Sequence, residues 1–252
     1  MKSAVVACAF VLVAGGGPPA VPPSPTVLVE LFTSEGCSSC PPADALLARL
    51  LETQPLAGVE IVPLELHVDY WDRLGWKDPF SSAAFSRRQE DYSTVFGPDS
   101  VYTPQMVVDG AQALVGSDAR LAASAIQQAV TLPHLTMGVS GDLRGDTVRI
   151  AVDAPAAPAG AAEKIGVVIA VVEDGLISPV KRGENTGRTL THMAVARRLE
   201  TIGVLDKDAF AGEGQWKLGS GWQPSRLRVV AFLQGQKSRR VYGSVQARLG
   251  SR

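Results

Sequence analysis

Cys37 and Cys40 are the residues of this 252-residue chain whose type and spacing most directly suggest chemistry. Two serines separate them, and a Cys-x-x-Cys pair can exchange thiols with disulfides, bind a metal or staple a turn. A bond between the two would close a very short loop and would restrict the unfolded chain little, so a staple alone explains the pair poorly. The pair therefore indicates redox chemistry.

A zinc site is the second possibility for the pair. Zinc in proteins takes about four ligands from cysteine, histidine and carboxylate side chains. The chain has three histidines, His67, His134 and His192, and no two of them stand at a metal-ligand spacing such as His-x3-His. The sequence therefore disfavours a zinc site.

The flanks of the pair place it between a strand and a helix. Residues 27–32, VLVELF, form a short apolar run with one carboxylate, and turn-forming residues follow them. From Pro41 onwards, two prolines suit the first turn of a helix, and leucines within 46–51 form its apolar face. We expect Cys37 at the helix N-terminus, where the dipole favours its thiolate and makes it an accessible attacking sulfur. Cys40, further along and more covered, is the expected resolving thiol.

The composition is that of a packed soluble protein. Hydrophobic residues make up 46% of the chain, charged residues 19%, and the formal net charge is -1. No long run of like charge offers a surface for nucleic acid or for lipid headgroups. The length allows two ordinary domains, and neither nucleic acid nor a membrane surface is expected as a partner.

Residues 1–20 have the pattern of a secretory signal peptide. A lysine at position 2 precedes an apolar stretch from Ala4 to Ala14, and glycines and prolines follow. We expect cleavage between Ala14 and Ala20, which would discard Cys8 and place the mature chain in the periplasm or outside the cell. An uncleaved anchor is the alternative. No later stretch reaches about 18 apolar residues, so stable membrane insertion is not expected after cleavage.

The order of predicted elements over residues 26–132 resembles the thioredoxin superfamily. After the first strand and helix, the pattern predicts a strand over 59–69, an inserted helix over 79–96 with Asp78 as its cap, a hairpin over 106–115 and a helix from about 118 to 130. A lone Cys-x-x-Cys would be weak evidence for this superfamily, but within this order of elements it is specific.

The resemblance also assigns a role to the segment VYTPQMVVDG. In thioredoxin-like proteins, a Thr-Pro or Ile-Pro pair with a cis peptide bond lies against the active-site disulfide, and Thr103–Pro104 matches that pair. Cis bonds are only about 5–6% of X-Pro bonds in folded proteins, so this expectation rests on the resemblance. It adds Thr103 and Pro104 to the expected catalytic site.

Most of the mature chain is similar to an exported bacterial family catalogued as a domain of unknown function, whose first half is thioredoxin-like. This similarity is carried by the segments ELFTSEGCSSCPPAD, HVDYWDRLGWKDPFS, YTPQMVVDG and GENTGRTLTHMAV. The family implies a fold and a site, and it brings no established substrate and no cofactor.

Three ionisable residues are candidates to assist the cysteines. Glu30 falls near the position of the buried acid of thioredoxins and could take the proton of Cys40, although a strand glutamate can instead face solvent. His67 and Asp69 end the second predicted strand, and the carboxyl ends of parallel strands meet at one edge of a sheet. His67 could support the Cys37 thiolate or move a proton, or it could be a hydrogen-bonded structural residue.

Trp71 and Glu35 complete the set of candidate site residues. Trp71, with Tyr70 and Trp76, could wall a substrate groove or could pack against the inserted helix. Glu35 stands where many thioredoxins have an aromatic residue. Its charge would oppose a neighbouring thiolate, so the sequence does not fix the redox potential.

Residues 133–252 have a different pattern. Antiparallel strands are predicted by short alternating runs over 135–143, 148–154, 165–172, 227–234 and 241–248. We expect a thioredoxin-like α/β fold with an inserted helix over 26–132, followed by a mainly antiparallel, sandwich-like β domain over 133–252. Within GENTGRTLTHMAV, Arg188 and His192 could hold an anion, but a well-bonded loop that docks the two halves is the more common outcome.

Two functions follow from these expectations. The first is a periplasmic or secreted thiol–disulfide oxidoreductase that acts on a protein dithiol or disulfide, with Cys37 attacking and Cys40 resolving the mixed disulfide. The second is a binding module in which Cys37, Cys40 and His67 hold Cu(I), which thiolates suit, or in which the second half recruits another envelope protein.

Overall fold

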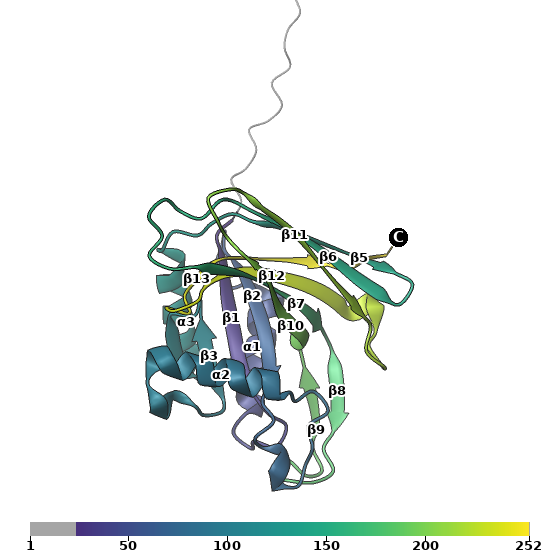
Figure 1. Cartoon of the computed structure of the whole chain (residues 1–252). Helices are drawn as coiled ribbons and strands as arrows, with labels where there is room; N and C mark the ends of the chain where they lie inside the picture. Colours follow the sequence, from purple (N-terminus) through teal and green to yellow (C-terminus); the bar gives the residue numbers. More distant parts are fainter. Residues whose placement is uncertain (1–23, 252) are drawn as a thin grey trace, which may run out of the picture.

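A computed structural model describes residues 24–251, and the expected signal peptide at residues 1–20 lies outside this range. The first part of the described chain alternates strands and helices (Figure 1). In chain order these elements are β1 (Thr26–Thr33), α1 (Pro41–Thr53), β2 (Glu60–His67), α2 (Ala83–Phe96), β3 (Gln105–Val108), β4 (Gln112–Val115) and α3 (Ala119–Val130). Short 3-10 helices lie at Asp72–Leu74 and Pro98–Ser100.

The second part of the described chain consists of strands with one further 3-10 helix at Pro224–Arg226. The strands are β5 (Gly138–Arg144), β6 (Thr147–Ala154), β7 (Ile165–Glu173), β8 (Leu176–Pro179), β9 (Thr189–His192), β10 (Val195–Val204), β11 (Phe210–Lys217), β12 (Leu227–Gly235), β13 (Val241–Arg248) and β14 (Gly250–Ser251). Across residues 24–251, no helix has the length and apolar character needed to cross a membrane.

Strands from both halves of the chain form one mixed sheet in the order β13-β12-β7-β10-β2-β1-β3-β4. β1 runs parallel to β2 and antiparallel to β3. β10 joins the halves, because it pairs with β2 through Val195 and Glu65 and with β7 along most of its length. The boundary expected near residue 132 therefore does not separate two sheets. An unpaired edge on β2 would expose backbone donors and acceptors, and β10 covers the part of that edge at Glu65.

The two faces of β1 pack against different helices. Val27, Val29 and Leu31 lie in one hydrophobic core with residues of α1 and α3. Leu28 and Phe32 point to the opposite face and share a core with residues of α2. Successive side chains of a strand alternate between faces, so α1 and α2 cover opposite sides of the sheet.

A smaller sheet, in the order β11-β6-β5-β14, packs on the part of the large sheet that β7, β12 and β13 form (Figure 1). Ile150 and Trp216 of the small sheet share a core with Ile169 and Ala231 of the large one. Sandwich-like packing is therefore present, but one of its two layers is the end of the shared sheet rather than part of a separate domain. The remaining hairpin, β8-β9, lies beside α1.

Helix α2 begins later than the sequence predicts. Its cap is Ser82, whose side chain accepts the N–H of Ala84 at 3.2 Å. Asp78, the expected cap, instead accepts the N–H of Glu35 at 2.8 Å and lies 2.7 Å from a ring nitrogen of His67. Asp78 is thus a residue of the site rather than of the helix terminus.

Candidate functional site

Cys37 and Cys40 form a disulfide in the turn that joins β1 to α1. Their sulfur atoms are 2.20 Å apart and their Cα atoms are 5.4 Å apart. Cys40 occupies the N-cap of α1, and prolines follow it in the first turn, as the sequence predicts. The cysteine at the helix N-terminus is therefore Cys40. Cys37 lies three residues earlier, in the turn before the helix, and its carbonyl oxygen accepts the N–H of Cys40 at 3.2 Å.

The expectation that the Cys37 sulfur is accessible is wrong for this conformation. Both cysteines are 0% exposed. The two serines between them, Ser38 and Ser39, face solvent. The disulfide thus lies just beneath the surface, under its own turn and next to a loop of residues 183–188, here named the covering loop.

The covering loop is hydrogen-bonded to the cysteine turn. The side-chain amide of Asn185, itself buried, donates to the carbonyl oxygens of Glu35 at 2.8 Å and Cys37 at 3.0 Å. The carboxylate of Glu184 accepts the N–H of Ser38 at 2.9 Å. The well-bonded docking loop favoured by the sequence is therefore present, and it fixes the backbone on both sides of Cys37.

Thr103 and Pro104 are joined by a cis peptide bond, as the resemblance predicts. The indole nitrogen of Trp71 donates to the Thr103 hydroxyl at 2.8 Å. The same tryptophan lies against the cysteine turn, because a Cβ placed on Gly36 would be 3.1 Å from the Cβ of Trp71. Trp71 therefore connects the turn to Thr103.

Pro104 reaches the first turn of α1 across Gly116. A Cβ placed on Gly116 would lie 3.2 Å from the Cβ atoms of both Pro104 and Ala43, and 2.6 Å from Leu31. A side chain at this position would force its neighbours apart, so glycine permits both Pro104 and Ala43 of α1 to approach this backbone closely. The predicted residues Thr103, Pro104 and Trp71 are thus brought to the segment that carries the cysteines.

Glu30 is buried, as proposed for a proton acceptor, but its partners give it a different role. Arg88 of α2 donates to both carboxylate oxygens, at 2.5 Å and 3.0 Å. The hydroxyl of Tyr92 is hydrogen-bonded to one of them. Because Glu30 points to the α2 face of the sheet and α1 covers the other face, the expectation that it takes the proton of Cys40 is corrected.

A buried cluster of two histidines and four carboxylates lies at the same end of the sheet as the cysteine turn. We name it the acid–histidine cluster; its members are Glu35, Asp44, Glu65, His67, Asp78 and His192. Glu65 is at its centre. Oε1 of Glu65 lies 2.7 Å from Nδ1 of His192 and 3.2 Å from Nε2 of His67. Its other oxygen accepts the N–H of Met193 at 3.1 Å, which orients the carboxylate.

Each histidine also faces a second carboxylate with its other ring nitrogen. Nδ1 of His67 lies 2.7 Å from Asp78, and Nε2 of His192 lies 3.4 Å from Oε1 of Glu35. The remaining oxygen of Glu35 accepts the indole N–H of Trp76 at 2.6 Å. The cluster is therefore built from two carboxylate–histidine pairs arranged around Glu65.

Asp44 joins the cluster from the first turn of α1. One of its oxygens accepts the hydroxyl of Thr33 at 2.6 Å, and the other lies 4.0 Å from Nδ1 of His192. The backbone N–H of Asp44 donates to the carbonyl oxygen of Cys40 at 3.2 Å. Asp44 therefore connects the cluster to the cysteine at the helix N-cap.

Burial and mutual proximity shift the pKa values of Asp44, Glu65 and the two histidines. Burial raises the pKa of Asp44 to about 7, and the nearby charge of Glu65 adds to the rise. Burial also disfavours the charged form of Glu65, but the two histidines outweigh it and lower the pKa of Glu65 to about 2. Burial opposes a charge on His67, yet Asp78 and Glu65 raise its pKa to about 10. The pKa of His192 is raised well above its ordinary value, because Glu65 and Glu35 overcome the effect of burial.

Sequence reasoning identified His67 and Glu35 as candidates and His192 as a possible anion ligand, but it missed the cluster that joins them. His192 approaches Glu65 from 127 residues away, so no local spacing reveals the pair. One available signal is the alternation of Glu65 and His67 on β2, which places two polar side chains on one face of an apolar strand. Asp69, also predicted here, instead accepts the hydroxyl of Ser86 at 2.5 Å and anchors α2.

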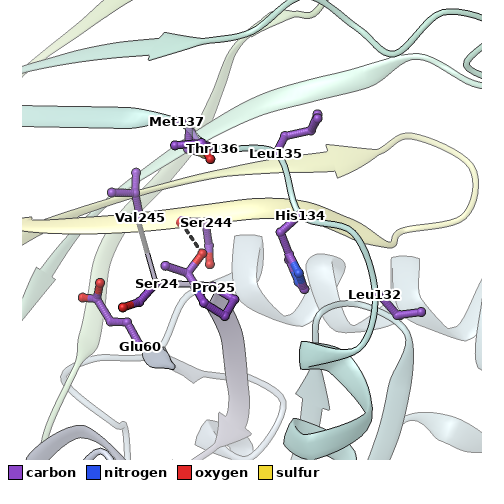
Figure 2. A pocket seen from close by; sticks show the side chains of 11 residues that line it. Ser24, Pro25, Glu60, Leu132, His134, Leu135, Thr136, Met137, Ser244 and Val245 are labelled. Atoms are coloured by element: carbon purple, nitrogen blue, oxygen red, sulfur yellow. Dashed lines mark hydrogen bonds between the residues drawn. The ribbon is translucent and has the colours of Figure 1, made fainter. Parts of the chain in front are cut away.

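A pocket of about 390 Å³ lies at the opposite end of the sheet, around the start of β1. Figure 2 shows Pro25, Glu60, His134 and Ser244 around it. None of the predicted site residues lines it. Because β1 spans eight residues, the pocket and the cysteine turn are separated by roughly 23 Å along the strand.

A second hollow, of about 470 Å³, lies beside the cysteine turn. Its walls are the outer side of α1, including Pro41 and Arg49, and the segment from Arg188 to Met193. Asp44 also contributes to its lining. Through Asp44 this groove adjoins the cluster, and another of its lining residues, Pro41, directly follows Cys40 in the chain.

Comparison with known proteins places the chain in a family. A family model described as "Protein of unknown function (DUF1223)" matches residues 28–234. The chain belongs to the DUF1223 family. This confirms the resemblance to a family of unknown function. None of the curated proteins is matched by the chain.

Solved structures share the architecture of this DUF1223 protein. Protein AGR_C_4864 from Agrobacterium tumefaciens is 27% identical with a TM-score of 0.66, and the match covers 89% of this chain and 94% of that one. HBP35 of Porphyromonas gingivalis is 13% identical with a TM-score of 0.66, over 90% of this chain and 76% of that one. The second likeness concerns the fold alone. The mixed central sheet with smaller sheets packed on it is therefore shared with solved proteins.

Proposed function

We propose that this DUF1223 protein exchanges thiols and disulfides through Cys37 and Cys40. The observation that carries the proposal is the disulfide itself, set between β1 and the N-cap of α1. A thioredoxin-like assignment of the α/β part belongs to this proposal, and it is supported by the cis bond before Pro104 and by the packing of Pro104 on α1. The partner is a protein dithiol or disulfide.

Exchange at this pair takes two displacements. A partner thiolate attacks Sγ of Cys37, a mixed disulfide forms, the Cys37–Cys40 bond breaks, and Cys40 leaves as a thiolate. A second partner thiolate then attacks the partner sulfur of the mixed disulfide, and Cys37 leaves. The partner is thereby oxidised, the pair gains two electrons, and the protons lost by the partner thiols are taken up by the two cysteines. The reverse sequence oxidises the pair and reduces the partner.

The position of Cys40 favours it as the first leaving group. It caps α1, where unpaired backbone N–H groups and the helix dipole stabilise negative charge. A stabilised thiolate also leaves faster from a disulfide. The helix dipole was expected to stabilise the thiolate of Cys37, but its effect is greater on Cys40, which occupies the N-cap.

Burial of the disulfide requires that the covering loop move before a partner can attack. The two hydrogen bonds from Asn185 oppose this movement. Each such bond contributes about 0.5–1.5 kcal/mol net to the closed position of the loop. Their loss should therefore change the rate at which the disulfide is reduced. Reduction of the folded protein by dithiothreitol, measured as the appearance of two free thiols, tests whether the disulfide reacts at all.

Asn185→Ala is expected to speed that reduction by about tenfold, because it removes the two bonds from the Asn185 side chain to the cysteine turn. The measurement is the rate of thiol appearance under excess dithiothreitol. Thr186→Ala is the matched control, since its hydroxyl donates only to Gly183 within the loop. If the two variants react at the same rate, the covering loop does not gate the disulfide.

The alternative of a Cu(I) site at Cys37, Cys40 and His67 has weaker support. Both ring nitrogens of His67 face carboxylates, at 2.7 Å and 3.2 Å. The histidine is therefore committed to oxygen partners rather than to the sulfurs.

A location outside the cytoplasm is part of the proposal. A disulfide persists in oxidising compartments such as the bacterial periplasm or the exterior of the cell. The expected leader at residues 1–20 supports the same placement on sequence grounds alone.

A further inference from the structure

Three donor atoms of the acid–histidine cluster converge on one point. They are Oε1 of Glu65, Nε2 of His67 and Nδ1 of His192, and all lie within 4.8 Å of one another. Glu65 is 3.2 Å from His67 and 2.7 Å from His192. Ligands of a tetrahedral zinc ion at about 2.1 Å stand roughly 3.4 Å apart, so small side-chain movements would suffice to admit a cation.

The outer contacts of both histidines match the second shell of a metal site. A metal-bound histidine almost always gives its other ring N–H to a carboxylate, a carbonyl or water. His67 faces Asp78 in this way at 2.7 Å, and His192 faces Glu35 at 3.4 Å. Asp78 is held in turn by the N–H groups of Glu35 and Phe80.

Hydrogen bonds leave one histidine–carboxylate pair of the cluster poorly satisfied. Oε1 of Glu35 and Nε2 of His192 are buried and face each other at 3.4 Å, and neither makes a hydrogen bond of normal geometry within 24–251. A neutral imidazole has a single N–H, yet each histidine presents both nitrogens to carboxylates. The two ring centroids are only 4.7 Å apart, so two imidazolium rings here would repel each other. One dication bound between two neutral rings supplies the same positive charge without that repulsion.

We propose that Glu65, His67 and His192 bind a divalent transition-metal ion of the zinc class, with Asp44 as the fourth ligand. The free oxygen of Asp44 is 4.0 Å from Nδ1 of His192. Binding at Nδ1 would leave the His192 proton on Nε2, directed at Glu35. Two imidazoles with carboxylates suit Zn²⁺, whereas Ca²⁺ and Mg²⁺ prefer oxygen ligands and Cu(I) prefers sulfur.

This site is distinct from the exchange chemistry of the cysteines. None of its proposed ligands is a sulfur atom, and Asp44 is the link between the two through its backbone bond to Cys40. The proposal therefore does not depend on redox activity. Metal binding is expected to survive in a Cys37→Ser/Cys40→Ser variant.

The test uses the mature full-length chain, freed of any histidine tag and stripped of metal by a chelator. Zn²⁺ is titrated in competition with a chromogenic chelator, and Co²⁺ is added separately to record the visible absorption of a tetrahedral site. Wild-type protein is expected to bind a single equivalent of either ion. His192→Gln and His67→Gln are expected to weaken binding by at least about 100-fold, and Asp78→Asn by about 10–100-fold.

His134→Gln is the matched control, because His134 is the remaining histidine and also faces a carboxylate, Asp109, at 2.8 Å. It lies by the pocket of Figure 2 and should bind metal like the wild type. The proposal is overturned if folded wild-type protein binds neither Zn²⁺ nor Co²⁺. It is also overturned if His134→Gln weakens binding as much as His192→Gln. The same holds if the Cys37→Ser/Cys40→Ser variant loses the metal while the His67 and His192 variants keep it.

Discussion

Replacing Cys40 with serine is expected to trap a mixed disulfide on Cys37, whereas replacing Cys37 with serine is expected to abolish exchange. In the proposed sequence Cys37 bears the partner and Cys40 resolves the bond. Without Cys40, the adduct on Cys37 has no internal thiol to release it. The measurement is the mass of each variant after incubation with a peptide that contains a disulfide, read before and after addition of dithiothreitol.

The two cysteine variants control for each other. Both lose the same disulfide, and a loop this short contributes only about 2 kcal/mol, so their stabilities should match. A difference in adduct formation therefore reports chemistry rather than folding. Equal adducts on the two variants would contradict the assigned roles, and a faster adduct on Cys40 would reverse them.

Replacing Arg88 with methionine is expected to lower the free energy of unfolding by about 3–5 kcal/mol, because it leaves the Glu30 carboxylate buried without its counter-ion. Arg88 also donates to Gln234 of β12 at 3.0 Å, so the change loosens the contact between the two halves of the chain. Urea unfolding followed by circular dichroism measures the loss.

Arg87→Met is the matched control for this effect. Arg87 is the neighbouring residue on α2 and is exposed, so its replacement should change the free energy of unfolding by less than about 0.5 kcal/mol. Adding Glu30→Leu to Arg88→Met should restore much of the lost stability, since apolar replacement of a whole buried pair is often neutral. If Arg88→Met is no less stable than Arg87→Met, Glu30 does not depend on its salt bridge.

The local elements of the first half follow from the sequence because their signals are short-range. The run at 27–32 became β1, the prolines after Cys40 became the first turn of α1, and the helix predicted from about 118 to 130 became α3. The start of α2 did not follow, since Asp78 holds the local N–H of Phe80 and the distant N–H of Glu35 while the helix itself begins after Ser82.

The joining of the halves was not predictable from local pattern. β10 meets β2 at a single register pair, Val195 with Glu65. The sequence pattern of each strand does not reveal which strand lies beside it in the sheet. A boundary at 132 was a reasonable expectation because the element pattern changes there. The sheet nevertheless continues across it, since β2 would otherwise have an open edge.

The site divides in the same way. Cys37, Cys40 and Thr103–Pro104 are recognisable from motifs, and their placement follows from the order of elements. The contact between Asn185 and the carbonyl oxygen of Cys37 was not predictable, because the sequence singles out the segment GENTGRTLTHMAV but not the turn, 148 residues away, on which it packs. The acid–histidine cluster is likewise assembled by tertiary contact, so a search for histidine spacing could not find it.

The most direct test of the central claim is to equilibrate the folded protein with glutathione buffers of graded ratio and to count free thiols after quenching. The proposal predicts a reversible two-electron couple for Cys37 and Cys40, with one midpoint reached from both the oxidised and the reduced side, between about -270 and -120 mV. A disulfide that stays oxidised in every buffer, in the wild type and in Asn185→Ala alike, and opens only when the chain unfolds would contradict it.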